Sequence, residues 1–153
     1  MAATTPNKIL LQVNGADRPD YHDKQAATAT IKPGMLIELA SATTVTPVAT
    51  ADKTNTRMIA LEVATAPDVT QPAINQAYAS GDNVRYFYAA PGDLVYMWLT
   101  PAQTAVIGSV LASSAAAGEL SVEATNVGHN VIGIAEEAVT TTGAAARIKV
   151  RIL

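Results

Sequence analysis

Two histidines, three spaced aspartates and one pair of adjacent glutamates are the side chains of this chain with potential for acid–base or metal chemistry. His22 and His129 lie in polar stretches, the chain has no cysteine, and no serine stands in a Gly-x-Ser-x-Gly sequence. No nucleophile with an adjacent base is therefore indicated. We expect both histidines to be solvated loop residues, and we expect a protein that is not an enzyme.

The acidic residues lack the spacing of a metal site or of a catalytic pair. Asp17, Asp20 and Asp23 recur every third residue, whereas a calcium loop of the EF-hand type uses alternate residues and a closing bidentate glutamate. Glu136 and Glu137 are adjacent, so on a strand their side chains would point to opposite faces. Neither of the usual glycine-rich phosphate-binding patterns occurs. We expect no metal and no cofactor.

Length and composition favour one compact body with protein partners. The chain has 153 residues, of which 49% are hydrophobic and 15% are charged, and its net charge is −3. This is enough apolar material for one core. The ten Lys and Arg residues are scattered, so no basic patch for nucleic acid is indicated. A surface so poor in charge suits packing against other proteins.

No membrane segment and no signal peptide are expected. Residues 94–118 carry no charge, but Pro101, Gln103 and Gly108 interrupt the apolar run well short of a membrane span. The N-terminal sequence MAATTPNK lacks a basic region followed by an apolar block. The absence of cysteine excludes disulfides and leaves oligomerisation as one source of stability.

The elements that must position these residues are predicted to be strands. From residue 30 onward, short apolar runs of period two are separated by Gly, Pro, Asp and Thr about every ten residues, a spacing typical of antiparallel strands. At the C-terminus, Ile148, Val150 and Ile152 share one face and three cations share the other, which predicts a strand that is half buried and half wet. Helix signals are weak. We expect a mainly β fold, a small antiparallel β-barrel or sandwich with little helix.

Residues 94–99 are apolar on both faces, which predicts a strand that is covered on two sides. Val95, Met97 and Leu99 are therefore candidates for a subunit interface. Packing in the internal core of the same chain is the favoured alternative.

Two Pro-Gly pairs, Pro33-Gly34 and Pro91-Gly92, each stand directly before an apolar run. Proline fixes φ at the first inner position of a turn, and glycine accepts the positive φ of the next position. Each pair is predicted to form a type II turn that leads the chain into a strand.

The first 29 residues differ in character from the rest. A short apolar piece, ILLQV, is followed by the polar stretch NGADRPDYHDKQ, which contains turn-forming residues and little that could build a core. We predict an extended N-terminal arm over residues 1–29 and a single β-rich domain over residues 30–153.

A series of phrases, in order along the chain, resembles the head-decoration, or capsid-cement, proteins of tailed bacteriophages. The phrases are IKPGMLIEL, RMIALEV, INQAYASGDNVRYFYAAPGDLVYMWL, VIGSVLASSAAAGELSV, VIGIAEEAV and RIKVRIL. They cover nearly all of residues 30–153, and their order and spacing carry the resemblance more than any single phrase.

The resemblance implies a small β-rich protein, commonly a homotrimer, on the outer capsid surface of the virion. Its partner would be the major capsid protein of the expanded head, bound at three-fold and quasi-three-fold positions, with neither nucleic acid nor membrane as a partner. Such a protein is made and assembled in the host cytoplasm. In this family an N-terminal extension often reaches along the shell, which agrees with the predicted arm.

The predicted capsid contacts lie in the arm. An apolar set is expected to add a strand to a neighbouring subunit, although an ordinary first strand of the same barrel is an open alternative. A polar set is expected to contact the shell, with a mobile loop as its alternative. The apolar set is Ile9, Leu10, Leu11 and Val13, and the polar set is Asp17, Arg18, Asp20, Tyr21 and His22.

Two other functions compete with capsid decoration. A phage tail or surface adhesion module could bind a host glycan through exposed, coplanar rings, although apolar neighbours favour core or subunit packing for these rings. A hydrolase could pair His22 or His129 with an aspartate. The candidate rings are Tyr86, Phe87, Tyr88, Tyr96 and Trp98.

Overall fold

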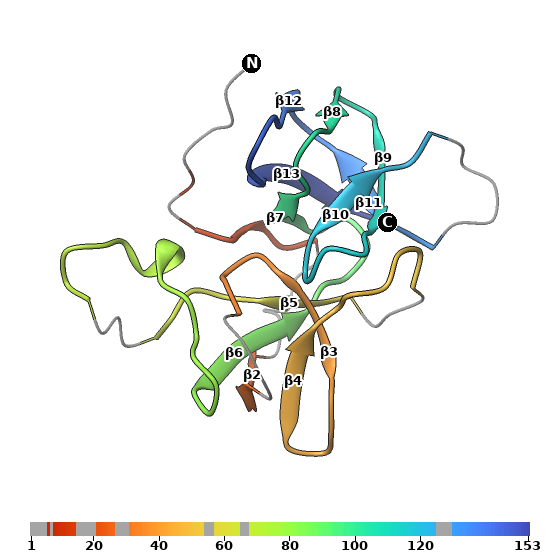
Figure 1. Ribbon diagram of the computed structural model, residues 1–153. Coiled ribbons are helices and arrows are strands. Elements are labelled where there is room, and N and C mark those ends of the chain that lie inside the picture. Colours follow the sequence, from red (N-terminus) through yellow and green to blue (C-terminus); the bar gives the residue numbers. More distant parts are fainter. Residues whose placement is uncertain are drawn as a thin grey trace.

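The computed structural model describes residues 6, 8–14, 21–26, 31–53, 57–64, 68–124 and 130–153 (Figure 1). The described chain is mainly β with almost no helix, as the sequence predicts. Its strands are β1 (Leu10–Gln12), β2 (Tyr21–Ala26), β3 (Leu36–Leu39), β4 (Thr44–Pro47), β5 (Met58–Ala60), β6 (Asn83–Tyr88), β7 (Leu94–Leu99), β8 (Thr104–Ala105), β9 (Val110–Ser113), β10 (Leu120–Val122), β11 (Val131–Ala135), β12 (Val139–Thr140) and β13 (Ala146–Ile152), and one short 3-10 turn is η1 (Ala73–Asn75).

The strands close into two small rings. The first is a closed barrel in the order β2-β4-β3-β5-β6. The second is part of a larger sheet, β1-β7-β10-β9-β11-β13, in which an additional pairing of β13 with β7 joins β7, β10, β9, β11 and β13 into a ring. Figure 1 shows the second sheet stacked on the first barrel, with the small β12-β8 sheet at its far end.

The predicted antiparallel pairing holds except for one pair in each ring. β2 runs parallel to β4, and β10 runs parallel to β7. Each ring contains five strands, and strand direction cannot alternate all the way round a closed ring with an odd number of members. One parallel pair per ring is therefore a geometric requirement of closure.

Strands β3, β5 and β6 each bury side chains on both faces. One set of side chains fills the interior of the first barrel: Ile37, Met58 and Tyr86. The other set belongs to a second cluster that continues into the second sheet: Leu36, Ile59 and Phe87. The outward face of the barrel is thus covered by the second sheet, because successive side chains of a strand point to opposite sides. The two rings share one continuous junction.

Both Pro-Gly pairs form the predicted turns. The φ angles of Gly34 and Gly92 are 87° and 92°, and the fourth turn residue donates back to the first, as in Met35 N to Lys32 O at 3.1 Å. The first turn is buried at the junction: a Cβ on Gly34 would lie 2.8 Å from the backbone oxygen of Tyr96. The position thus needs glycine for both its φ and its close packing.

Arg147 is buried, which corrects the prediction of a wet cationic face on β13. The residue is only 7% exposed. Its guanidinium group donates to the carbonyl oxygens of Pro33 and Ile74 and, at 3.0 Å, to Asn75 Oδ1. The guanidinium carbon lies 4.4 Å from the ring centroid of Trp98, whose Nε1 also donates to Pro33 O at 2.9 Å. Burial lowers the pKa of Arg147 to about 10, against the opposing effect of the Glu62 charge.

The described part of the N-terminal segment packs within the body instead of projecting from it as an arm. β1 pairs with β7, and β2 closes the first barrel between β4 and β6. Asn14 fastens the segment to the second Pro-Gly turn, since its backbone N donates to Asp93 Oδ1 at 2.8 Å and its Nδ2 donates to Pro91 O at 2.9 Å. The composition did not indicate this packing, because β1 and β2 pack against a core that is built by strands later in the sequence.

Replacing Gly34 with Ala should destabilise the protein more than replacing Gly81. Both glycines have a φ of 87°, but a Cβ on Gly81 would meet nothing within 4 Å. Gly81→Ala should cost roughly 1 to 2 kcal/mol for the left-handed backbone, and Gly34→Ala should cost roughly 1 to 3 kcal/mol more for overpacking. Urea unfolding followed by circular dichroism measures both; equal losses would contradict the buried turn.

Arg147→Met should lower the free energy of unfolding by about 3 kcal/mol, because it removes the hydrogen bonds that the guanidinium donates to Ile74 O, Asn75 Oδ1 and Pro33 O. Lys149→Met is the matched control on the same face of β13. Lys149 is half-buried and lies 5.9 Å from the Tyr96 ring centroid, so its loss should cost less than about 1 kcal/mol. Similar urea midpoints for both variants would refute the structural role of Arg147.

Candidate functional site

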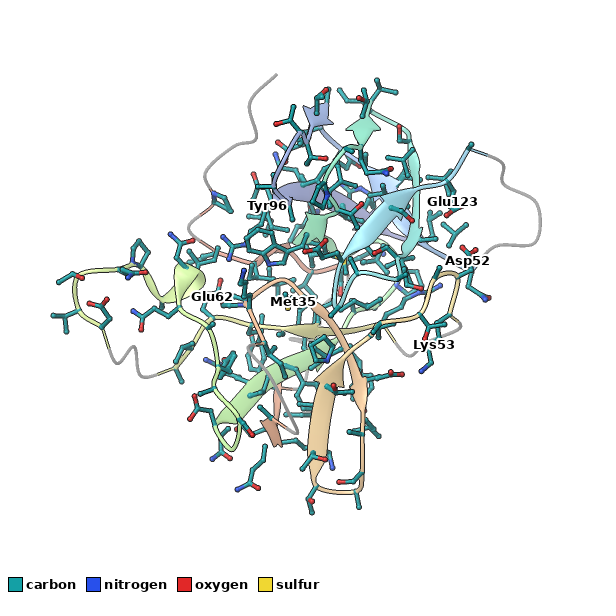
Figure 2. The ribbon with its side chains drawn as sticks, viewed as in Figure 1. Met35, Asp52, Lys53, Glu62, Tyr96 and Glu123 are labelled. Carbon is teal, nitrogen blue, oxygen red and sulfur yellow. The ribbon has the colours of Figure 1, made fainter. Side chains whose placement is uncertain are left out.

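The apolar contact set forms an ordinary first strand of the body, the alternative that the sequence left open. Ile9 is completely buried in the core cluster, so it is a core residue and is not available to a partner. Leu10 and Val13 are half-buried, and Leu11 is exposed. Figure 2 shows Glu62 and Tyr96 near the junction that Ile9 bridges, where Ile9 N donates to the Glu62 carboxylate and Tyr96 N donates to Ile9 O.

The polar contact set is described only in part: Asp17, Arg18 and Asp20 lie outside the described residues, as does His129. Tyr21 is 47% exposed, and the guanidinium carbon of Arg85 lies 4.5 Å from its ring centroid. His22 is not the solvated loop residue that was predicted. It lies in β2, and its side chain points toward the interior of the first barrel. Its ring therefore stacks on Tyr86 at a centroid distance of 5.5 Å.

A small cleft lies between β1 and the first barrel. Its volume is about 190 Å³. The N-terminal segment, β2, β6 and the stretch after β5 all contribute side chains to it, so a polar hollow forms where four distant segments meet. We call it the junction cleft; it is lined by Lys8, Leu10, Tyr21, Leu61, Glu62 and Arg85.

A larger pocket of about 460 Å³ adjoins the junction cleft through Arg85, which lines both. At its base, the Tyr78 hydroxyl donates to the carbonyl oxygens of Leu61 and Glu62, each at 3.1 Å. Burial raises the pKa of Tyr78 to about 12, partly offset by its hydrogen bond from the Arg85 backbone. Asp23 and Asp82 line the pocket opposite these groups.

The charged lining of the junction cleft is what sequence reasoning missed. Tyr21 and Leu10 were predicted contact residues, whereas Lys8, Glu62 and Arg85 were not. Nothing in the sequence indicated that Glu62 would line the same cleft as Tyr21 and Arg85. That arrangement depends on the pairing of β2 with β6 and on the hydrogen bond from Leu61 N to Arg85 O at 2.8 Å, which places the stretch after β5 beside β6.

The candidate subunit interface on β7 is internal. Val95, Met97 and Leu99 are each completely buried within the chain. The favoured core alternative is therefore the one observed, because β13 pairs along one edge of β7 while β1 and β10 share the other.

The aromatic side chains do not form the exposed, coplanar platform that a glycan site would need. Phe87, Tyr86 and Tyr96 are buried, and Trp98 is half-buried against Arg147. Tyr88 is exposed, but its ring meets that of Tyr86 edge-on, at an interplanar angle of 75°. Most of these rings serve packing, as their apolar neighbours predicted.

The described residues hold no group of three His, Cys, Asp or Glu side chains that could bind a metal ion. Over the same residues, no helix has the length and apolar character needed to cross a membrane. The features that remain are surfaces: a tyrosine–arginine pair beside a polar cleft, and exposed apolar side chains on turns.

No protein-family model matches the chain, and no curated protein matches it. Among solved structures, the chain is similar to the N base of the head fiber gp8.5 of bacteriophage phi29, with a TM-score of 0.50 and 11% sequence identity. The match covers 89% of this chain and 95% of that chain. At this identity the likeness concerns the fold, and it extends over nearly the whole of both chains.

Replacing Tyr78 with Phe should change how stability depends on pH. The folded-state pKa of about 12 lies above the ordinary value of 10.0, so this group's stabilising contribution is present below pH 10 and is lost as the pH rises toward 12. Tyr78→Phe removes the three hydrogen bonds of the hydroxyl, to Leu61 O, to Glu62 O and from Arg85 N, and should be less stable than the parent at neutral pH. The difference in free energy of unfolding between the parent and Tyr78→Phe should become smaller between pH 10 and pH 12. Urea midpoints across this range measure it, and Tyr88→Phe is the exposed control. A constant difference would contradict the prediction.

Proposed function

We propose that this chain is a structural protein of a bacteriophage head, which binds the outer surface of the major capsid protein shell and stabilises the mature head against the pressure of its DNA. The observation that carries the proposal is the fold likeness, over most of both chains, to the N base of a phage head fiber. The ordered phrases that resemble head-decoration proteins support it independently. On this proposal the chain is not an enzyme.

The proposed protein acts as a homotrimer at three-fold and quasi-three-fold positions of the shell. It is made in the host cytoplasm and assembled there onto the expanded head. A structural role of this kind requires a stable body and contact surfaces, and the two fused rings with their shared core supply the body.

The surface around the junction cleft is the proposed shell contact. Tyrosine and arginine are the residue types that most often dominate binding energy at protein interfaces. Here Arg85 already lies over the Tyr21 ring, so little side-chain freedom would be lost on binding.

The outer edge of β1 offers a second kind of contact. β1 pairs with β7 on one edge, and within the described residues no strand pairs with its other edge. An extended segment of a capsid subunit could add there as a further strand, with backbone hydrogen bonds supplying affinity. The sequence predicted that residues 9–13 add as a strand to a neighbouring subunit. Here the neighbouring subunit would instead supply the strand that pairs with β1.

Stabilisation of the shell would follow from mass action. A protein that binds the assembled shell better than free subunits shifts the equilibrium against disassembly. A trimer that contacts several subunits at once gains avidity, because each contact after the first is intramolecular. No group with a tuned pKa and no cofactor is needed for this action.

Tyr21→Ala should weaken binding to the shell at least about tenfold, since it removes a preorganised ring from the contact surface. Val69→Ala is the control, because Val69 is 96% exposed on a loop outside the junction cleft. Co-sedimentation with expanded heads of the phage that encodes the chain measures both affinities. Equal binding of Tyr21→Ala and the parent would refute the contact surface.

Cryo-electron microscopy of the same heads tests the function itself. Density for the parent protein on the outer shell at three-fold and quasi-three-fold positions is the expected result. Shells that remain bare when mixed with excess protein would overturn the proposed function, whatever the behaviour of the Tyr21 variant.

A further inference from the structure

One end of the second sheet exposes no charged side chain over two segments of the chain. Residues 100–109 and 138–146 contain no Asp, Glu, Lys or Arg. Pairing of β8 with β12 brings the segments together, with Ala105 opposite Val139 and Thr104 opposite Thr140. Figure 1 shows both strands at the end of the molecule farthest from the β3–β4 hairpin. We call residues 100–109 and 138–146 the uncharged end.

Two apolar side chains project from the uncharged end on a well-braced turn. Val106 is 59% exposed and Ile107 is 72% exposed. Ser109 braces the turn, since its N donates to Val106 O and its Oγ accepts from Val106 N, both at 2.9 Å. Gly108 N donates to Ala135 O at 2.8 Å, which fixes the turn to β11. A rigid apolar projection loses little conformational entropy when it is covered.

The base of the uncharged end is held equally firmly. Thr141 is buried, and its Oγ1 donates to Thr100 O at 2.6 Å and accepts from Gln103 N at 2.9 Å. Ala105 and Val139 are buried beneath the exposed threonines of β8 and β12. The surface is therefore preorganised.

Charged side chains flank the second segment. Glu136 and Glu137 directly precede the second segment. Glu136 Oε1 accepts from Arg151 Nε at 2.6 Å, and Glu137 Oε1 accepts from Lys149 N at 2.8 Å. An uncharged centre with a polar rim is the composition of a protein–protein interface.

We infer that the uncharged end is the surface through which copies of this chain associate with one another. In a closed symmetric oligomer, the same side chains of each copy face one another near the axis, so a charge there would meet its like. The other exposed apolar residues have charged neighbours in sequence or space, such as Asp68 beside Val69 and Arg151 near Leu153. The uncharged end lets a second copy bind without that repulsion.

The inference deepens the homotrimer part of the proposed function, but it concerns free protein and needs no shell. Light scattering on the full chain, separated by size over a dilution series, measures its mass. The expected mass is three chains for the parent, and Ile107→Asp should weaken association at least about tenfold by placing like charges together. Val69→Asp, which adds the same charge at an exposed valine outside the uncharged end, should leave the mass unchanged.

A second substitution guards against a local folding defect. Thr140→Glu adds a charge at an exposed position of β12, and circular dichroism with a urea midpoint shows whether each variant keeps its fold. A monomeric parent at all concentrations would overturn the inference, as would folded Ile107→Asp and Thr140→Glu variants of unchanged mass. If the parent is monomeric while Ile107→Asp loses shell binding, the uncharged end contacts the shell instead, which also overturns it. If the parent protein is a trimer but does not bind the shells, the proposed function is overturned and the inference about the uncharged end stands.

Discussion

The buried guanidinium of Arg147 is the interaction on which the rest of the structure depends. It comes from the last strand, yet it binds the carbonyl groups of Pro33 and Ile74, which belong to the other side of the junction. Burying a cation is costly, and several hydrogen bonds together with the face of the Trp98 ring offset that cost. The turn at Gly34 must pack closely beside it, so one residue far along the chain holds the two rings together.

Several polar groups of the body serve as fastenings between segments. Asn14 and buried Asp93 hold the N-terminal segment, and buried Thr141 holds the β8–β12 end. The surfaces proposed for partners are the junction cleft, the outer edge of β1 and the uncharged end. The junction cleft has a charged lining and a tyrosine, whereas the uncharged end has no charge, so these two suit different partners.

Two of the six residues that line the junction cleft, Leu10 and Tyr21, were among the contact residues predicted from the sequence. Arg85 and Glu62 were not, because they come to lie beside Tyr21 only after strands distant in sequence have paired. His22 was misjudged for the same reason: its neighbours in sequence are polar, but its neighbour across the barrel is Tyr86.

The sequence by itself determined what short-range geometry controls. Proline and glycine set the two turns through their φ angles, and period-two alternation placed Ile148 and Val150 on a buried face. Only the tertiary structure decided which strands bury side chains on both faces, because that depends on how the strands close into rings and how the rings pack together. Two five-stranded rings each require a parallel pair, and the first ring includes β2, whereas β1 pairs with the edge of β7. Alternation states which side of a strand a residue occupies, whereas the burial of Arg147 depends on what lies on that side.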